Sequence, residues 1–161
     1  MGINKRIIIT SIIIFFIDQL SKYLIDKFLL VGESIKLIFN ISLTRVSNSG
    51  AAFSILEGKT IFLLLISVVL IVIILKISKD SKNLLSDIYY GLIIGGILGN
   101  FLDRLVFSYV RDFIDINLFG YNFPIFNIAD SAIVIGIILY IISLVGEKDE
   151  VNRWRKRRKS R

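Results

Sequence analysis

Four long apolar stretches dominate the pattern of the chain. Uncharged runs at 7–17, 60–75, 88–102 and 131–146 hold 11, 16, 15 and 16 residues. A helix needs about 20 residues to cross about 30 Å of hydrocarbon, so each run must be extended by its neighbours to span a bilayer. We therefore predict an all-α membrane protein with four transmembrane helices, at about 5–25, 59–77, 87–107 and 128–146, and a tail at 147–161.

The acidic residues of these extended runs gather at one end of the predicted bundle. Asp18, Asp103 and Asp130 fall within the spans or at their edges, and Asp112 and Asp115 follow the third span. Charged side chains at such depths are costly unless they face the bundle interior or a wet cavity. Because successive helices run in opposite directions, all five acids come to the same end, and we expect the other halves of the spans to carry none.

The basic residues predict the orientation. Thirteen of the 20 Lys and Arg lie at the N-terminus, between the second and third spans, and in the C-terminal tail. Cytoplasmic segments carry this kind of excess, so both termini are expected in the cytoplasm and the acids near the outer leaflet. Residues 1–17 have the basic start and apolar centre of a signal peptide, but no small-residue cleavage site follows, so we expect a retained first helix.

Composition supports the membrane prediction and narrows the chemistry. Hydrophobic residues make up 55% of a chain of 161 residues, more than a water-soluble domain of this size can bury. The length fits one domain, 1–161. The chain has no Cys and no His, which excludes disulfides, thiolate nucleophiles, zinc–sulfur sites and Ser–His or Cys–His relays. An enzyme of this composition must use Asp, Glu, Lys, Tyr, Ser or Thr.

The tail is strongly basic from Arg153 to Arg161 and supplies much of the net charge of +7. We expect it to bind anionic lipid at the membrane surface, with Trp154 at the interface. Nucleic-acid binding is the alternative for a run of this kind, and we do not expect it here.

Several of the polar groups also have a purely structural interpretation. Asp18 and Lys22, at i and i+4, would form a helix ion pair. Asn100, Asp103 and Arg104 share a helix face and would clamp the bundle, since polar groups hold membrane helices together. The glycines of the same helix, Gly95, Gly96 and Gly99, would allow close approach of a neighbouring helix or of a substrate.

Two acids remain after this. Asp130 would be an N-cap of the fourth helix, with Pro124 breaking the chain before it. Asp112 lies in an alternating segment, 109–115, that predicts a strand or extended turn, and Arg111 would merely pair with it. Two carboxyls close together in a pocket of low dielectric share a proton, so that one activates water while the other polarises a carbonyl oxygen. This aspartyl-protease chemistry needs neither His, Cys nor metal.

Five sequence blocks, in this order and spacing, resemble the motifs of bacterial lipoprotein signal peptidase (signal peptidase II). The likeness runs from the first predicted helix through the fourth. The blocks are Asp18-Gln19-Leu20-Ser21-Lys22, Asn48-Ser49-Gly50-Ala51-Ala52-Phe53, Gly99-Asn100-Phe101-Leu102-Asp103-Arg104, Val110-Arg111-Asp112-Phe113-Ile114-Asp115 and Phe123-Pro124-Ile125-Phe126-Asn127-Ile128-Ala129-Asp130-Ser131.

The resemblance implies an intramembrane aspartic endopeptidase of the bacterial inner or plasma membrane. Such enzymes remove the signal peptide of prolipoproteins just before a cysteine that carries a diacylglyceryl group. The motifs carry the catalytic pair onto Asp112 and Asp130. They carry the supporting positions, which bind substrate or maintain the site, onto Asp18, Lys22, Asn48, Gly50, Asn100, Asp103, Arg104 and Asn127. Diacylglyceryl-modified prolipoproteins and membrane lipids are the implied partners, and we expect no cofactor, no metal and a monomer.

The resemblance also implies a small extracytoplasmic β-cradle and a short surface helix, supplied mostly by residues from about 32 to 56. Within this segment the run 37–43 is predicted to be a strand and 48–50 a turn.

One departure from the family pattern precedes Asp112. The family usually has an apolar residue where this chain has Arg111. In an extended segment adjacent side chains point to opposite faces, which would direct Arg111 to water or lipid headgroups. If Arg111 instead turned inward, it would hold Asp112 ionised and assign it the role of base.

Two other functions fit parts of the pattern. A proton- or ion-coupled small membrane transporter would use Asp18, Asp103 and Asp130 as relay groups, but the acids share one depth and no inverted repeat is evident. A non-catalytic scaffold would use the same acids only to hold the bundle together, and it predicts that charge-preserving exchanges are tolerated. A carboxylate metal site would need six or more oxygen ligands, and no acidic loop has that spacing.

Overall fold

The computed structural model describes residues 3–50, 56–79, 81, 83–118 and 120–159, with the side chains of 147–159 excepted. Its helices are α1 (Lys5–Phe28), α2 (Thr60–Ser78), α3 (Leu84–Phe107) and α4 (Ile128–Lys159). Its strands are β1 (Ser34–Ile38), β2 (Ile41–Asn48), β3 (Val110–Leu118) and β4 (Tyr121–Asn122).

The four helices follow the four apolar runs closely. Each contains a segment long and apolar enough to cross a membrane, at Lys5–Phe28, Thr60–Ser78, Leu84–Phe107 and Ile128–Gly146. Large apolar side chains on their outer faces are exposed, among them Phe16 (63%), Leu65 (60%) and Ile142 (59%). An outer surface of this kind suits lipid rather than water, and the protein is a multi-pass membrane protein.

Helix α3 is the centre of the bundle and packs against α1, α2 and α4. Its glycines explain why the contacts are so close. A Cβ atom at Gly95 would lie 2.7 Å from the Ser11 carbonyl oxygen of α1, and one at Gly96 would lie 2.5 Å from the Ala129 carbonyl oxygen of α4. Helix backbones meet at these positions because no side chain separates them, so Gly95 and Gly96 serve helix packing.

The strands form one antiparallel sheet in the order β1-β2-β3-β4. The segment 37–43, predicted as a single strand, instead contains the turn between β1 and β2 at Phe39 and Asn40, and Phe39 has φ +36°. The turn predicted at 48–50 follows the end of β2, where the Gly50 amide donates to Asn48 Oδ1 (3.0 Å). The extended conformation predicted around Asp112 is confirmed as β3.

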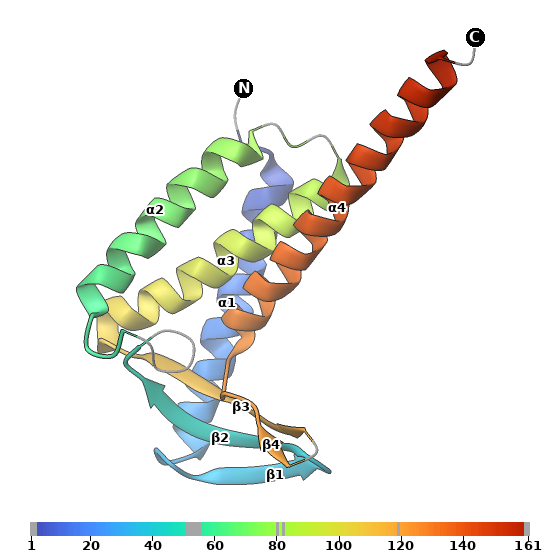
Figure 1. The fold of residues 1–161 in the computed structure, drawn as a ribbon. Helices are drawn as coiled ribbons and strands as arrows, with labels where there is room; N and C mark the ends of the chain where they lie inside the picture. Colours follow the sequence, from blue (N-terminus) through green and yellow to red (C-terminus); the bar gives the residue numbers. More distant parts are fainter. Residues whose placement is uncertain (1–2, 51–55, 80, 82, 119, 160–161) are drawn as a thin grey trace.

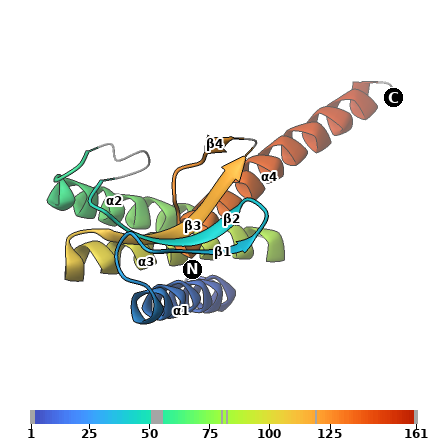
Figure 2. The ribbon, with the colours of Figure 1, turned by 90° about the horizontal axis from the view of Figure 1, so that it is seen from below.

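The sheet and the chain termini lie at opposite ends of the bundle (Figure 1). The connection between α2 and α3 lies at the end of the termini, as four antiparallel spans require. Seen from the sheet end in Figure 2, the strands lie across the bundle, with α1 on one side of β1–β3 and α2 on the other.

Three details differ from the sequence prediction or extend it. Helix α4 continues without a break to Lys159, so the described part of the tail is helical. Asp87 lies in the first turn of α3, buried at the end opposite the other acids, where Asn4 and Ser81 donate to it. The prediction that this end carries no acid was therefore wrong. The described residues of 32–56 hold no helix, and 51–55 lie outside the description.

Candidate active site

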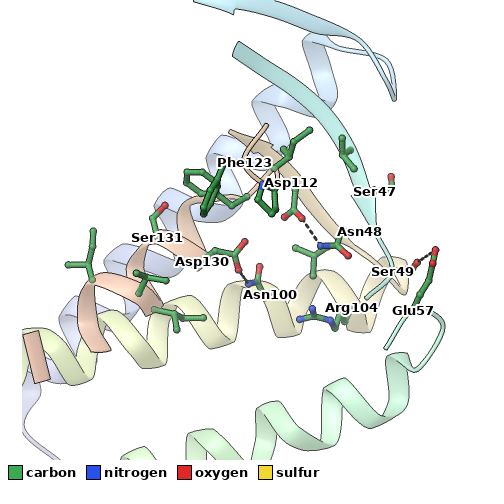
Figure 3. Close-up of a pocket in the computed structure, with 18 residues that line it drawn as sticks. Ser47, Asn48, Ser49, Glu57, Asn100, Arg104, Asp112, Phe123, Asp130 and Ser131 are labelled. Carbon is green, nitrogen blue, oxygen red and sulfur yellow. Dashed lines mark hydrogen bonds between the residues drawn. The ribbon is translucent and has the colours of Figure 1, made fainter. Parts of the chain in front are cut away.

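Asp112 and Asp130 line one cavity at the junction of the sheet and the helices. Asp112 stands on β3, and Asp130 stands in the first turn of α4. Figure 3 shows both carboxyl groups directed into the cavity from these two elements, with Asn100 and Arg104 of α3 on another wall. The cavity has a volume of about 840 Å³. It is polar around the two acids and apolar along α4 and the segment before it, where Phe123, Pro124, Ile125, Phe126, Ile133, Val134 and Ile135 line it.

Asn127 joins the two carboxyl groups. Its Nδ2 donates to Asp112 Oδ1 (2.7 Å), and its backbone N–H donates to Asp130 Oδ2 (3.3 Å). In return the Asp130 amide donates to Asn127 Oδ1 (2.9 Å). This reciprocal pair is a capping box at the start of α4. Asp130 is thus part of the helix cap, one turn inside the N-cap position predicted for it, and its carboxyl still faces the cavity.

Asn100 supports the same pair from α3. Its Nδ2 donates to Asp130 Oδ1 (2.7 Å), while its Oδ1 accepts from Asn127 Nδ2 (3.1 Å) and Lys22 Nζ (3.0 Å). Asp112 Oδ1 and both carboxyl oxygens of Asp130 therefore have an N–H donor. This fixes the side-chain rotamers before any substrate arrives.

Asn48, Gly50 and Arg104 complete the wall on the side of β2. Asn48 Nδ2 donates to Asp112 Oδ2 (2.9 Å). Arg104 Nη2 donates to the Gly50 carbonyl oxygen (2.9 Å), which holds the segment after β2 against α3. Arg104 also lines the cavity and brings a positive charge toward the two acids.

The position of Asp112 favours its neutral form. Burial, and next the negative charge of Asp130, raise the pKa of Asp112 to about 7, although hydrogen bonds from Asn48 and Asn127 oppose the shift. A buried carboxyl beside a second carboxyl retains a proton that an exposed one would lose. Two carboxyls in this arrangement can hold one proton between them near neutral pH.

Asp18, Lys22 and Asp103 form a buried cluster behind the cavity. Lys22 Nζ lies 2.8 Å from Asp18 Oδ2 and 3.3 Å from Asp103 Oδ2, and all three side chains are fully buried. Asp18 Oδ1 accepts from the Ala129 amide (2.9 Å) at the start of α4. The helix ion pair predicted for Asp18 and Lys22 is confirmed, and its wider network connects three helices.

Arg111 neither faces water or lipid headgroups nor turns inward to Asp112, the two orientations predicted for it. Its side chain points away from Asp112, but it is buried rather than in water, and its guanidinium binds Asp103 Oδ1 (2.6 Å) and Asp26 Oδ2 (3.1 Å). Adjacent strand residues point to opposite faces, as expected. The face of β3 that carries the Arg111 side chain is covered by α1 and α3, because the strand crosses the ends of these helices.

Sequence reasoning missed some polar residues of this region. Asp26 forms ion pairs with Arg111 and Arg45. The sequence offered a sign of this residue, because Asp26 continues the i, i+4 row of charged residues that starts at Asp18 and Lys22. Glu57 lines the cavity with no sequence motif to mark it. Asp115 lies outside the cavity lining, where its Oδ2 accepts from Thr44 (2.8 Å).

Comparison with known proteins identifies the family. Residues 10–146 match the family model described as signal peptidase (SPase) II. Lipoprotein signal peptidases of Staphylococcus aureus strains JH9 and Newman are 42% identical over 157 residues, which cover 96% of this chain and 94% of theirs.

Two solved structures, both described as bacterial membrane enzymes determined by the in meso method, have the same fold. One has a TM-score of 0.85 at 36% identity and covers 93% of this chain and 95% of its own. The other has a TM-score of 0.78 at 39% identity and covers 86% and 91%. With its match to the family model over most of its length, the chain belongs to the signal peptidase II family of aspartic peptidases.

Proposed function

We propose that the protein is an intramembrane aspartic endopeptidase that removes the signal peptide of diacylglyceryl-modified prolipoproteins, cutting just before the lipidated cysteine. The observation that carries the proposal is the pair Asp112 and Asp130, which face one cavity and are joined by Asn127. Membership of the signal peptidase II family supports the substrate class.

The reaction uses the one proton that the pair holds. The ionised carboxyl accepts a proton from water while the water oxygen bonds to the scissile carbonyl carbon, and the protonated carboxyl gives its proton to the carbonyl oxygen. The resulting diol then breaks its C–N bond: the carboxyl that took the proton of water gives it to the amine nitrogen, and one diol hydroxyl returns its proton to the other carboxyl as the C=O bond re-forms. The signal peptide leaves with a new carboxyl group, and the lipidated cysteine becomes the N-terminal residue of the other product.

The supporting residues have distinct tasks in this scheme. Asn48, Asn100 and Asn127 keep the carboxyl groups oriented. This increases the reaction rate, because these groups need no reorganisation during the reaction. Asp18, Lys22 and Asp103 hold α1, α3 and the start of α4 together behind the cavity. Gly50 and Arg104 shape the cavity wall on the side of β2.

The surroundings of the site suit a substrate that arrives through the bilayer. A signal peptide and diacylglyceryl chains are both apolar, and the apolar lining along α4 offers them a surface. We place the sheet and the cavity at the outer leaflet, both termini in the cytoplasm, and the tail helix against anionic lipid, because of the Lys and Arg distribution. We expect the protein to act as a monomer in a bacterial cell membrane.

Cleavage by the purified protein in detergent tests the proposal. The wild type is expected to cut a diacylglyceryl-modified prolipoprotein in the presence of a chelator. Asp112→Asn and Asp130→Asn are expected to lose activity by a factor on the order of 10² to 10⁴, because each removes one partner of the proton transfer. Asp112→Glu and Asp130→Glu are also expected to be impaired, since the longer side chain displaces the carboxyl.

The control is Asp115→Asn, which removes an acid from the same strand outside the cavity lining and should cut at the wild-type rate. Near-wild-type activity in a folded Asp112→Asn or Asp130→Asn variant would show that the pair is not the catalytic dyad. Tolerance of all charge-preserving exchanges would favour the scaffold. A folded wild type without any cleavage would favour the transporter, which proton-flux measurements would then test.

A further inference from the structure

Six charged residues form a continuous line behind the cavity, which we call the ion-pair network. Successive members carry opposite charges and lie within 3.3 Å of each other. Arg45 Nε lies 2.8 Å from Asp26, which lies 3.1 Å from Arg111 Nη1. Arg111 Nη2 lies 2.6 Å from Asp103, which lies 3.3 Å from Lys22 Nζ. Lys22 in turn lies 2.8 Å from Asp18, so the network is Arg45, Asp26, Arg111, Asp103, Lys22 and Asp18.

The network touches the chain immediately before each of the two proposed catalytic residues. Arg111 precedes Asp112, and its own backbone N–H donates to Asp103 Oδ2 (3.0 Å). Asp18 Oδ1 accepts the N–H of Ala129, which precedes Asp130 (2.9 Å). One set of buried ion pairs therefore fixes both strand β3 and the start of α4 relative to the same helices.

The β-sheet itself holds β3 least regularly at this point. The pairing of β2 with β3 is regular from Val46–Asp112 to Asn48–Val110, then shifts between Val46 and Leu43. Such irregularities redirect side chains and interrupt ladder hydrogen bonds. Arg45 lies within the shifted segment and turns its side chain to Asp26. Next to Asp112, therefore, side-chain ion pairs help to hold β3 in place, as ladder hydrogen bonds do elsewhere in the sheet.

Arg111 is the member best suited to hold the strand. Its planar guanidinium meets three acceptors at once, Asp103 Oδ1, Asp26 Oδ2 and Gln19 Oε1 (2.8 Å). Its outer face lies over the Phe107 ring, 4.7 Å from the centroid. A planar fork fixes direction as well as distance, whereas a lysine supplies only a point charge.

We propose that Arg111 is a positioning residue for Asp112: its guanidinium, held by Asp103, Asp26 and Gln19, anchors β3 to α1 and α3 and thereby sets where the Asp112 carboxyl stands relative to Asp130. The inference rests on the proposed function. It assigns Arg111 no contact with substrate, since its side chain is on the face of β3 opposite the cavity. Buried ion pairs add little net stability, because the cost of desolvating the charges offsets their attraction.

Substitution of Arg111 is expected to alter rate and protonation together. In Arg111→Gln the strand loses its anchor, and kcat is expected to fall on the order of tenfold to a hundredfold with KM within about twofold, because a misplaced reacting group costs rate. Arg111→Lys keeps the charge without the fork and should fall in between. The matched control is Arg6→Gln, which removes an arginine whose side chain is 65% exposed at the end of the bundle away from the cavity and outside the ion-pair network, and it should leave kcat unchanged.

The protonation readout does not depend on turnover. The infrared band of the protonated Asp112 carboxyl, identified by its loss in Asp112→Asn, is titrated in wild type and variants. Asp112 is faced by Asp130 from α4, by Lys22 from α1 and by Arg104 from α3, all unchanged in the variants. A carboxyl that moves away from Asp130 and toward water loses its proton more readily, so the midpoint in Arg111→Gln is expected at lower pH than in wild type.

The outcomes distinguish a failure of the proposed function from a failure of the positioning role of Arg111. A wild type that shows the carboxyl band but no cleavage overturns the proposed function, and a midpoint shift in Arg111→Gln still supports the positioning role. A folded Arg111→Gln with wild-type kcat and midpoint, and only a lower unfolding temperature, shows Arg111 to be merely structural and overturns the inference. If Arg111→Gln does not fold, Arg111→Lys decides by the same two readouts.

Discussion

Lys22 shows how much the neighbourhood of a single residue decides in this protein. It is a fully buried cation whose ammonium group meets Asp18, Asp103 and the Asn100 amide oxygen. Its three donors are thus matched by three acceptors, which offsets the cost of burying the charge. Removal of Lys22 would leave two buried carboxylates without their shared partner.

Lys22→Met is therefore expected to destabilise the protein by about 3–5 kcal/mol, the usual effect of breaking a buried ion pair from one side. The measurement is thermal unfolding in detergent. Lys27→Met is the matched control, because Lys27 is exposed on the last turn of the same helix. Equal unfolding temperatures for the two variants would mean that the buried cluster is not coupled to folding.

Asp112 makes a prediction about pH. Burial and the charge of Asp130 raise its pKa to about 7, so Asp112 keeps a proton at pH values where an exposed Asp has lost it. The proposed dyad of Asp112 and Asp130 needs one proton, and it loses that proton as the pH rises past the upper pKa of the pair. Activity is thus expected to decline above about pH 7 in a pH profile of kcat/KM, which reports the pKa values of the free enzyme. A profile flat from pH 6 to 9 would contradict the assignment.

The sequence marked the two acids and the asparagines that the structure brings together at the cavity, but it marked neither Glu57 of the cavity lining nor the partners of Arg111. Motifs marked Asp112, Asp130 and the asparagines because their order and spacing are specific. The partner of Arg111 could not be derived, because Asp26 and Asp103 meet it only after β3 has crossed the ends of α1 and α3. Local spacing predicts contacts within one helix, such as that of Asp18 with Lys22, and is silent on contacts between elements.

At the scale of elements, α3 depends on glycine for its contacts. A Cβ atom at Gly99 would clash with Asp18 Oδ2 and lie 3.3 Å from the Ala129 side chain. Gly99 is thus the point where α3, the buried cluster and the start of α4 come within van der Waals contact.

Gly99→Ala is expected to displace Asp18, to cost about 1–3 kcal/mol through overpacking and to reduce kcat by an order of magnitude or more. Gly146→Ala is the control in another span, because a Cβ atom there meets nothing within 4 Å. Unfolding temperature and cleavage rate are measured for both. If Gly99→Ala behaves like Gly146→Ala, the contact between α3 and α1 is looser than the geometry indicates.

The elements themselves were predictable to different degrees. The helices follow from apolar runs, because lipid leaves a spanning segment little choice but a helix. The hairpin of β1 and β2 was hidden, because its turn falls on Phe39 and Asn40 inside an apolar run, and Phe is not a residue that marks a turn. The helix in the tail was also not predicted. The charged residues of the tail were taken as a sign of lipid binding, although Lys, Arg and Glu also favour a helix.

At the scale of the whole molecule, the two ends of the bundle differ in chemistry. The sheet end holds the cavity and its acids. The other end holds the termini and the connection between α2 and α3, where most of the Lys and Arg lie. A proteolytic site at the sheet end meets the signal peptide of an exported protein only if that end faces outward, so the orientation of the bundle decides whether the proposed substrate can reach it.

Because the chain has no Cys, single introduced cysteines report this orientation directly. Asn40→Cys in the hairpin turn and Lys79→Cys after α2 are both at exposed positions at opposite ends. A membrane-impermeant maleimide applied to intact spheroplasts is expected to label Asn40→Cys, and to label Lys79→Cys only after permeabilisation. The reverse pattern would place the cavity on the cytoplasmic side, where the signal peptide of an exported lipoprotein has its basic N-terminus and not its cleavage site, and the proposed function would then have to be given up along with the orientation.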